Sequence, residues 1–431
     1  MKNKLGAFLI ITLFCVIILL FNNYYALGVL YFYVLIFYLG IDVIKKKNIE
    51  LIHVWNASFL FIIIAEVFIF PEYNKYALEA LKFLTIANNL VCLGYLTSKS
   101  TISYKVTKLS KKKINKNTFR YLFKGLIVVY IFFQAKSVMN SISLGRINAM
   151  DDSTEVGGLY MQFIAALGLI LPAIIAYYYA YLVPSKILKP FFWSLPIFII
   201  LFLGGTRFPL LFSFLGFLLV LLSKQKKLTI KNYLFITGAI ILLNVAASTM
   251  RGFRAVGFGN TFTFIEEKKP FIDIPTFVSE KMSPEGVIRM TGLMIKHFEK
   301  NDYLYGKSTS FILYFWMPRS LWEDKPTMLG HWFIRKYEDG FSSGHSASFG
   351  FTGDFFADFG YLSLILVFFL GILLKRLNNY KNATFLQGGY NIVLGSMIFP
   401  WVFFFVRSPI TSTMTFIGVI VIYKLFKKIV Y

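Results

Sequence analysis

The sequence predicts an all-α integral membrane protein that crosses the bilayer many times. Of its 431 residues, 57% are hydrophobic and 15% are charged, whereas a soluble domain carries about 25% charged residues. Apolar runs of about twenty residues recur along the chain, which is the length a helix needs to cross a bilayer. Runs such as LILVFFLGILL do not alternate as the strands of a membrane barrel do. Helices are therefore the remaining way to satisfy the backbone in lipid.

About twelve segments are expected to be membrane helices. The first begins MKNKLGAFLI and has no small-residue cleavage site after it, so it is interpreted as an uncleaved helix. The fifth, seventh and eighth segments are short. In order, the segments are 5–21, 24–44, 51–70, 76–96, 121–133, 159–182, 190–203, 208–222, 230–250, 355–374, 390–406 and 410–423.

Lysine in the short loops predicts the orientation. When the helices alternate, the basic stretches all fall on one side, and the positive-inside rule makes that side the cytoplasm. Both termini lie there. The basic stretches are 45–47, 99–116, 224–227, 375–381 and the tail KLFKKIVY. This topology accounts for most of the formal charge of +24, so no nucleic-acid partner is expected.

The same topology divides the chain into three parts. Residues 1–250 hold the first nine helices and a smaller outer loop at 134–158. Residues 251–354 form a large extracytoplasmic loop between the ninth and tenth helices, and residues 355–431 hold the last three helices. The cytoplasmic connectors are too short for a catalytic domain, so any chemistry is expected on the outer face.

Arginine is concentrated on the predicted outer side. The orientation of a protein in the membrane requires only positive charge, which lysine supplies. The planar guanidinium of arginine, in contrast, suits the binding of phosphate and carboxylate groups. The distribution therefore suggests an anionic ligand outside, although pairing with loop acids or lipid phosphates is the alternative. The outer arginines are Arg146, Arg207, Arg251, Arg254, Arg289, Arg319, Arg335 and Arg407.

Three of these arginines lie where an outer helix end meets the membrane surface. Arg207 follows two glycines in LGGTRFPLL, so its guanidinium is expected at the depth of a lipid-linked phosphate. Arg251 and Arg254 share a helix face through their i, i+3 spacing and form a candidate diphosphate clamp. Snorkelling to ordinary headgroups and a solvated helix end are the alternatives.

The stretch PRSLWEDKPTMLG at 318–330 combines charge with aromatic surface. Arg319 and Lys325 are flanked by prolines, which favour a rigid turn. Trp322 offers a face for a sugar ring or for stacking of a guanidinium. Glu323 and Asp324 are as well explained by local salt bridges.

Four residues near the tenth helix are candidates for a general base. His345 in SSGHSASFG comes first because a neutral imidazole at the membrane surface can accept a hydroxyl proton. His331 is the next histidine candidate. Asp354 is an alternative base, with Asp358 beside it, although acids at this position also favour a helix N-terminus. Alternatively, His345 is an ordinary surface histidine without a catalytic role.

Neither a metal site nor a cofactor is expected. The histidines lack the HExxH spacing, the large loop has no cysteine, and no nucleotide-binding glycine loop is present.

The motifs GGTRFPLL, PRSLWEDKP and SFGFTGDFFADFGYLSLILVFFLG, with the helix number and the late outer loop, resemble the Wzy-type polymerases of bacterial O-antigen and capsular polysaccharide. In both outer loops an arginine precedes a glycine by eleven positions, at Arg146 and Gly157 and again at Arg319 and Gly330. The resemblance covers most of the chain.

The resemblance implies a GT-C-like, lipid-dependent glycosyltransferase of the bacterial inner (plasma) membrane. Such an enzyme moves a growing glycan from undecaprenyl diphosphate onto the next lipid-linked repeat unit, with no cofactor and with a chain-length regulator as a partner. The related O-antigen ligases are thought to use outer arginines and a histidine. The positions that match are Arg207, Arg251, Arg254 and Arg319, with His345 as an approximate match followed by Ser346 instead of asparagine.

Two other functions remain open at this point. A flippase or other transporter of lipid-linked oligosaccharides also fits twelve helices, although no internal repeat of the transporter kind is found. An O-antigen ligase would use the same lipid-linked donor with a different acceptor.

Overall fold

The structure is a computed structural model that describes residues 2–46, 49–69, 75–98, 114–144, 159–185, 188–204, 207–224, 286–317, 321–337 and 347–431. The described residues form helices and no strands, which confirms the predicted all-α class. In the amino-terminal half, the helices are α1 (Lys2–Leu20), α2 (Tyr24–Lys46), α3 (Leu51–Phe59), the π-helix η1 (Leu60–Ile64), α4 (Ala65–Ile69), α5 (Lys75–Thr97), α6 (Lys116–Leu144), α8 (Leu159–Tyr177), the π-helix η2 (Tyr178–Leu182), α9 (Leu188–Leu203) and α10 (Arg207–Leu222).

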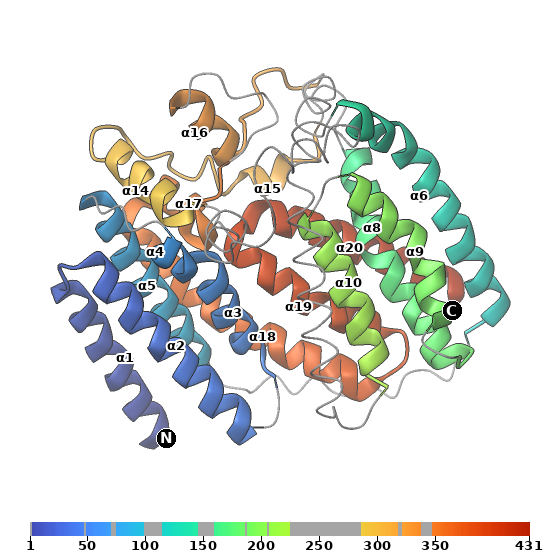
Figure 1. Ribbon diagram of the computed structural model, residues 1–431, viewed down its shortest axis with the longest axis horizontal. Coiled ribbons are helices and arrows are strands. Elements are labelled where there is room, and N and C mark those ends of the chain that lie inside the picture. Colours follow the sequence, from blue (N-terminus) through green and yellow to red (C-terminus); the bar gives the residue numbers. More distant parts are fainter. Residues whose placement is uncertain are drawn as a thin grey trace, which may run out of the picture.

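The carboxyl-terminal half adds short helices and three long ones. They are α14 (Val287–Phe298), α15 (Phe311–Tyr314), α16 (Leu329–Tyr337), η3 (Gly350–Thr352), α17 (Gly353–Phe359), η4 (Gly360–Leu362), α18 (Ser363–Gln387), α19 (Asn391–Arg407) and α20 (Pro409–Val430). In Figure 1, α1, α2 and α5 lie on one flank and α6, α8 and α9 on the other, with α19 and α20 between them. Helices α14 to α17 gather at one end, which we call the outer end after the expected topology.

Eleven of the twelve predicted membrane segments lie, apart from Phe70, in the described part of the chain. Eight of them coincide with a single helix, and the segments 51–70, 159–182 and 355–374 each coincide with a run of consecutive helical elements. Six spans there are long and apolar enough to cross a membrane, and five shorter apolar helices accompany them. The segment 230–250 lies outside the described residues. The protein is therefore a polytopic helical membrane protein.

The predicted carboxyl-terminal ends of three helices, α6, α18 and α20, are wrong; α20 continues to Val430 instead of ending at 423. Helix α6 has 29 residues, so residues 134–144, expected in the smaller outer loop, are helical. Helix α18 continues to Gln387 through the basic stretch 375–381, which was expected to be a loop. The length of an apolar run predicts only the part of a helix that lies in lipid. The extensions contain no glycine or proline that would stop the helix.

Contacts at the end opposite α14 join the basic stretches that were predicted to share a side. Leu51 N donates to Asn378 Oδ1 over 3.0 Å, and Lys375 Nζ lies 3.6 Å from Glu50 Oε2. Asn115 N donates to the carbonyl of Val430. These contacts support the prediction that successive helices cross the membrane in alternating directions. The assignment of this end to the cytoplasm rests on the lysines and stays a prediction.

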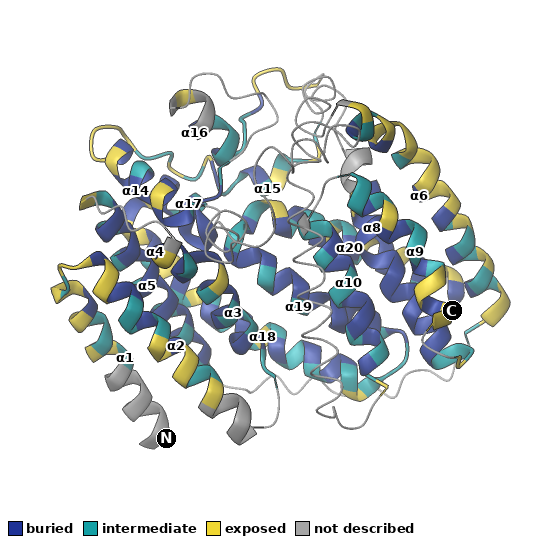
Figure 2. Ribbon diagram, in the orientation of Figure 1, coloured by how far each residue is buried: buried dark blue, intermediate teal, exposed yellow. Residues whose placement is uncertain are grey.

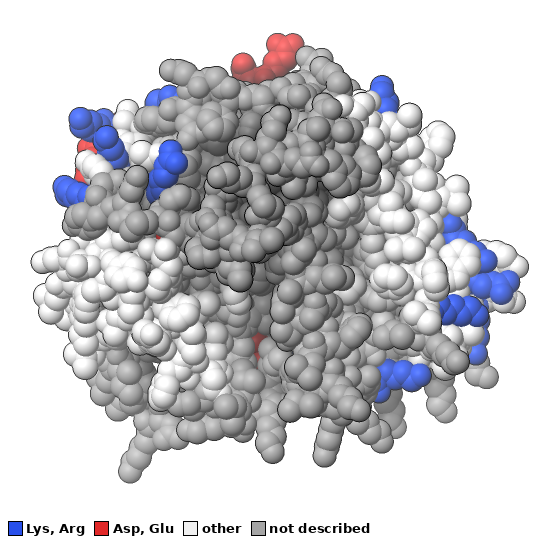
Figure 3. Space-filling view, viewed as in Figure 1, with Lys and Arg blue, Asp and Glu red and all other residues white. Residues whose placement is uncertain are grey.

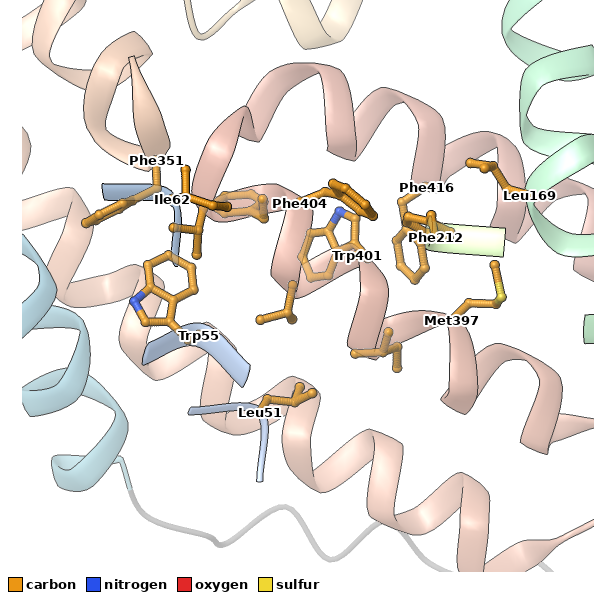
Figure 4. Packing of buried hydrophobic residues seen from close by; sticks show 14 of the residues in the cluster. Leu51, Trp55, Ile62, Leu169, Phe212, Phe351, Met397, Trp401, Phe404 and Phe416 are labelled. Atoms are coloured by element: carbon orange, nitrogen blue, oxygen red, sulfur yellow. The ribbon is translucent and has the colours of Figure 1, made fainter. Parts of the chain in front are cut away.

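The core consists of aromatic and aliphatic side chains that run through the middle of the bundle, whereas the outward faces of α1, α2 and α6 are exposed (Figure 2). Figure 4 shows Trp55 and Phe351 beside each other, with ring centroids 5.0 Å apart. Farther along, Trp401 stacks on Phe416 at 5.0 Å. The described surface carries few charges on the α1 and α2 flank, and Lys and Arg gather near α14 and along the opposite flank (Figure 3). Uncharged exposed faces suit contact with lipid.

Buried polar groups between α2, α3 and α5 satisfy one another. Asn88 receives the indole N–H of Trp55 at 2.8 Å and donates to Tyr31 and Asn56 at 3.0 Å each. Tyr31 donates in turn to Asn89 at 2.8 Å. Because lipid offers no partner, such a network joins the three helices at the depth where an unpaired amide would be costly.

Helices α5 and α18 touch backbone to backbone at two glycines. A Cβ added at Gly94 would collide with the carbonyl oxygen of Phe368, and one at Gly371 with that of Val91. Small residues permit this approach, as they do in membrane helix pairs generally.

We therefore expect Gly371→Ala to destabilise the protein by about 1–3 kcal/mol, because the two backbones must separate. The matched control is Gly125→Ala in α6, where a Cβ meets nothing within 4 Å and helix propensity gains up to about 1 kcal/mol. Thermal melting in detergent measures both variants. Equal melting temperatures for the two would contradict the close α5–α18 contact.

Candidate active site

Lys325 ties the segment PRSLWEDKPTMLG to the residues that directly precede it. The Lys325 ammonium is buried, donates to the carbonyls of Phe315 and Met317 over 2.8 Å each, and lies 5.3 Å from the centroid of the Phe311 ring. Trp322 remains 36% exposed and packs edge-on against Tyr314. Lys325 thus fixes the path of the loop that presents Trp322.

Two carboxylates of α17 organise the chain beneath that loop. Asp358 is fully buried, and its two oxygens accept the N–H groups of Ser308 and Thr309 at 2.9 and 2.7 Å. Asp354, one helical turn earlier, accepts the hydroxyl of Ser308 at 2.6 Å. Asp358 therefore has a structural role in holding the turn after Gly306, where the backbone takes φ of +91°.

Asp354 also lines a small pocket at the outer end. The pocket has a volume of about 30 Å³, which is room for a water-sized polar group. Its walls come from three separate parts of the chain. They are Met328–Gly330, Ala347–Gly350 with Asp354, and Arg407–Thr411.

Hydrogen bonds connect these three walls. The N–H of Ala347 donates to the carbonyl of Gly330 at 3.2 Å. The hydroxyl of Ser348 donates to the carbonyl of Arg407 at 2.6 Å. The pocket is therefore built where PRSLWEDKPTMLG ends, where SFGFTGDFFADFG begins, and where α19 gives way to α20.

Arg407 brings the motif GGTRFPLL to the same place. It is the last residue of α19, and its guanidinium carbon lies 4.1 Å from the ring centroid of Phe208. Phe208 follows Arg207, the first residue of α10. Arg407 thus contacts GGTRFPLL, and it lines the pocket together with the start of SFGFTGDFFADFG and with Met328–Gly330, which closely follow PRSLWEDKP in the chain.

Helix ends add to the positive potential of this region. Helix α20 begins with Ser408 as N-cap in an extended conformation and Pro409 in the first turn, and α10 begins at Arg207. A helix N-terminus carries a partial positive charge and suits an anion. Because Arg407 and Asp354 line the same pocket, the arrangement offers a place for negative charge in a pocket that also contains a carboxylate able to accept a proton.

The described structure includes some of the predicted site residues. Asp354 lines the pocket, and His331 follows Gly330 in the first turn of α16, where its N–H donates to Met328. Lys325 and Trp322 belong to the neighbouring loop, and of Arg207 only the backbone is described. Arg146, Arg251, Arg254, Arg319 and His345 lie outside the described residues.

Sequence reasoning missed Arg407 as a site residue although it counted among the outer arginines. The available signal was its position in FFFVRSPI, between two apolar segments and directly before a Ser-Pro pair that starts a helix.

His297, in contrast, is a packing residue. Its ring is buried against Phe298, Trp332 and Phe333, with centroids 4.8 to 6.1 Å away, and Nδ1 lies 3.2 Å from the amide nitrogen of Asn301. Burial lowers the pKa of His297, and the positive charge of Lys336 lowers the pKa further. Within the described ranges, no group of three or more His, Cys, Asp or Glu side chains is placed to hold a metal ion.

The bundle and its outer pocket define a polytopic membrane protein with a candidate anion-binding site. Comparison with known proteins finds two similar proteins. The chain is 27% identical over 333 residues to the O-antigen polymerase of Salmonella typhimurium (strain LT2), covering 73% of each protein. The O-antigen polymerase of Salmonella typhi matches with the same identity and coverage. Both relatives support the Wzy-type O-antigen polymerase family that the motifs indicate. No family model matches the chain, and no solved structure matches it.

Removal of the Asp358 charge should loosen the outer end. We expect Asp358→Asn to lower the free energy of unfolding by about 1.5–3 kcal/mol, because two charge-assisted bonds in a buried place are weakened. Asp302→Asn, at an exposed position of the same region, is the control. Thermal melting in detergent decides, and an Asp358→Asn protein as stable as the control would refute the structural role.

The His297 contact should make the outer end sensitive to acid. Because folding lowers the pKa of His297, the unfolded chain takes up a proton first as the pH falls. The contribution of neutral His297 to the free energy of unfolding is fully present above about pH 6.5 and is lost as the pH falls below that value. The melting temperature of the wild type should therefore fall more between pH 7.5 and 5.5 than that of His297→Phe, and equal falls would contradict the prediction.

Proposed function

We propose that the chain is a polysaccharide repeat-unit polymerase, which transfers a growing glycan from undecaprenyl diphosphate onto the next lipid-linked repeat unit. The observation that carries the proposal is the similarity to two O-antigen polymerases over 73% of the chain. The meeting of GGTRFPLL and the start of SFGFTGDFFADFG at Arg407 supports it, because two of the motifs then share one candidate site.

The proposed reaction needs positive charge more than it needs a cofactor. The diphosphate already activates the sugar, and negative charge builds on the leaving lipid diphosphate as the glycosidic bond breaks. Arg407 and the starts of α10 and α20 are proposed to stabilise that charge, an effect worth about 2.7–4 kcal/mol for a well-placed donor. The new glycosidic bond forms to a hydroxyl oxygen of the acceptor sugar.

The proton of that hydroxyl is proposed to pass to Asp354. This carboxylate lines the same pocket as Arg407, and it accepts a hydrogen bond from the hydroxyl of Ser308 at 2.6 Å. A base of this kind contributes about a hundredfold or more. His345 is the alternative base, and His331 is proposed to contact the glycan.

The remaining arginines are proposed as ligands of the diphosphate or the glycan. They are Arg146, Arg207, Arg251, Arg254 and Arg319. Trp322, with its exposed ring, is proposed to stack on a sugar. For Lys325 we propose a role in loop closure in place of phosphate contact, since two backbone carbonyls already receive its ammonium.

The proposal includes the surroundings of the enzyme. The substrate is a lipid-linked oligosaccharide in the bacterial inner membrane, both termini are in the cytoplasm, and a chain-length regulator is the proposed protein partner. No metal ion takes part in the proposed reaction.

Glycan length in cells tests the role of Arg407. In a strain that lacks this gene, we expect wild type to restore a ladder of long glycans, and Arg407→Ala to leave single repeat units on the surface. Arg407→Lys should recover little, because an ammonium lacks the planar fork. The matched control is Arg376→Ala, an exposed arginine of α18 at the other end of the bundle, which should restore the ladder.

Equal amounts of each variant in the membrane make the comparison valid. A full ladder with Arg407→Ala would remove Arg407 from the site. A deletion strain that displays no surface glycan at all and accumulates lipid-linked repeats inside would favour a transporter. Long lipid-linked glycan that fails only to reach its final acceptor would favour a ligase.

A further inference from the structure

Glu66 is a buried carboxylate at the outer end of the third membrane segment. It is 1% exposed and lies in α4. Its Oε2 accepts the N–H of Ile288 at 2.8 Å and its Oε1 accepts the N–H of Arg289 at 3.0 Å. A carboxylate of one helix therefore caps the first turn of another helix, α14, that is 222 residues away in the chain.

The chain around Glu66 is locally irregular. The π-helix η1 (Leu60–Ile64) interrupts the segment between α3 and α4. Each residue turns an α-helix by about 100°, so the extra residue of a π-turn redirects the face that follows it. Val67, the next residue, is fully buried against the bundle as well.

A carboxylate in this position is costly unless it is paired. Transfer of an unpaired charge out of water is strongly unfavourable, and charged groups inside membrane segments usually mark function. Here two N–H donors and the positive end of α14 offset the cost. The pairing in turn fixes where α14 begins.

Helix α14 packs directly against the wall of the candidate active site. The hydroxyl of Thr291 donates to the carbonyl of Phe349 at 3.3 Å. Gly350 has φ of +70°, and a Cβ there would lie 3.0 Å from Val287 Cγ1 and 3.6 Å from the carbonyl oxygen of Val406. The first five residues of α14 thus support Phe349 and Gly350, which line the pocket.

Residues 348–350 are connected to both Arg407 and Asp354, the two proposed reacting groups. Ser348 binds the carbonyl of Arg407, and Asp354 follows in α17 after η3. A shift of α14 would therefore move Asp354 relative to Arg407.

We propose that Glu66 is a positioning residue of the polymerase reaction. Its carboxylate fixes the first turn of α14, and α14 holds residues 349 and 350 so that Asp354 keeps its place in the pocket that Arg407 also lines. The inference rests on the proposed function. It assigns to a membrane-depth carboxylate a role in catalytic geometry without contact to substrate.

Two measurements on purified full-length protein test this role. The first is hydrogen–deuterium exchange of the first turn of α14, and the second is turnover with lipid-diphosphate-linked repeat units, separated into kcat and KM. The variants are Glu66→Gln, which keeps the size but presents an amide donor to one N–H, and Glu66→Asp, which shortens the reach. The matched control is Tyr76→Phe, which removes the exposed bond from Tyr76 to Glu299 at the other end of α14.

We expect Glu66→Gln to raise exchange at residues 287–291 by about tenfold or more, because a charge-assisted bond is lost. The kcat should fall by about tenfold or more, while KM changes by less than about threefold, because only transition-state geometry is affected. Glu66→Asp should lie between Gln and wild type in both measurements, and Tyr76→Phe should change neither.

Two results would overturn the inference. One is unchanged protection of α14 in Glu66→Gln. The other is lost protection with unchanged kcat, because α14 would then not control the site. If Glu66→Gln does not accumulate as folded protein, Glu66→Asp supports the same comparison. A wild-type protein that extends no glycan would overturn the proposed function instead, and the exchange result would still decide whether Glu66 fixes α14.

Discussion

The structure depends on one constraint, which is that polar groups at membrane depth must find their partners within the protein. Backbone groups meet this constraint as helices, and side chains meet it by joining helices. Asn88 ties together α2, α3 and α5 through three hydrogen bonds to side chains, and Glu66 ties a membrane segment to the outer helix α14. At the outer end, Asp358 does the same for the turn at Ser308. Each of these three buried side chains therefore also connects distant parts of the chain.

These connections explain how an apolar helical bundle can present a polar site. The walls of the outer pocket come from segments that are far apart in sequence, and each is anchored by a buried polar contact. Arg407 and the starts of two helices contribute positive charge, while Asp354 contributes a carboxylate. This composition is the basis of the proposal that the leaving group of the substrate is a diphosphate.

The sequence was sufficient for the fold class and for the existence of eleven described helices, because apolar length is a local property. It was insufficient for the ends of α6 and α18, where polar helix continues beyond the apolar stretch. Of the candidate site, Asp354 was predicted and lies in the pocket, whereas Arg407 was counted but not selected. The role of Glu66 was out of reach, since its partner is 222 residues away and only the folded chain shows which carboxylate meets which helix end.

The central claim is that this chain joins lipid-linked repeat units without help from another enzyme. The direct measurement supplies purified protein in detergent with lipid-diphosphate-linked repeat units alone, in the absence of nucleotide sugar, and separates the lipid-linked products by length. The account predicts products of two and more repeat units, together with one released lipid diphosphate for each bond formed. Products that remain one unit long, from a protein that moves the same lipid across a sealed vesicle membrane, would contradict it.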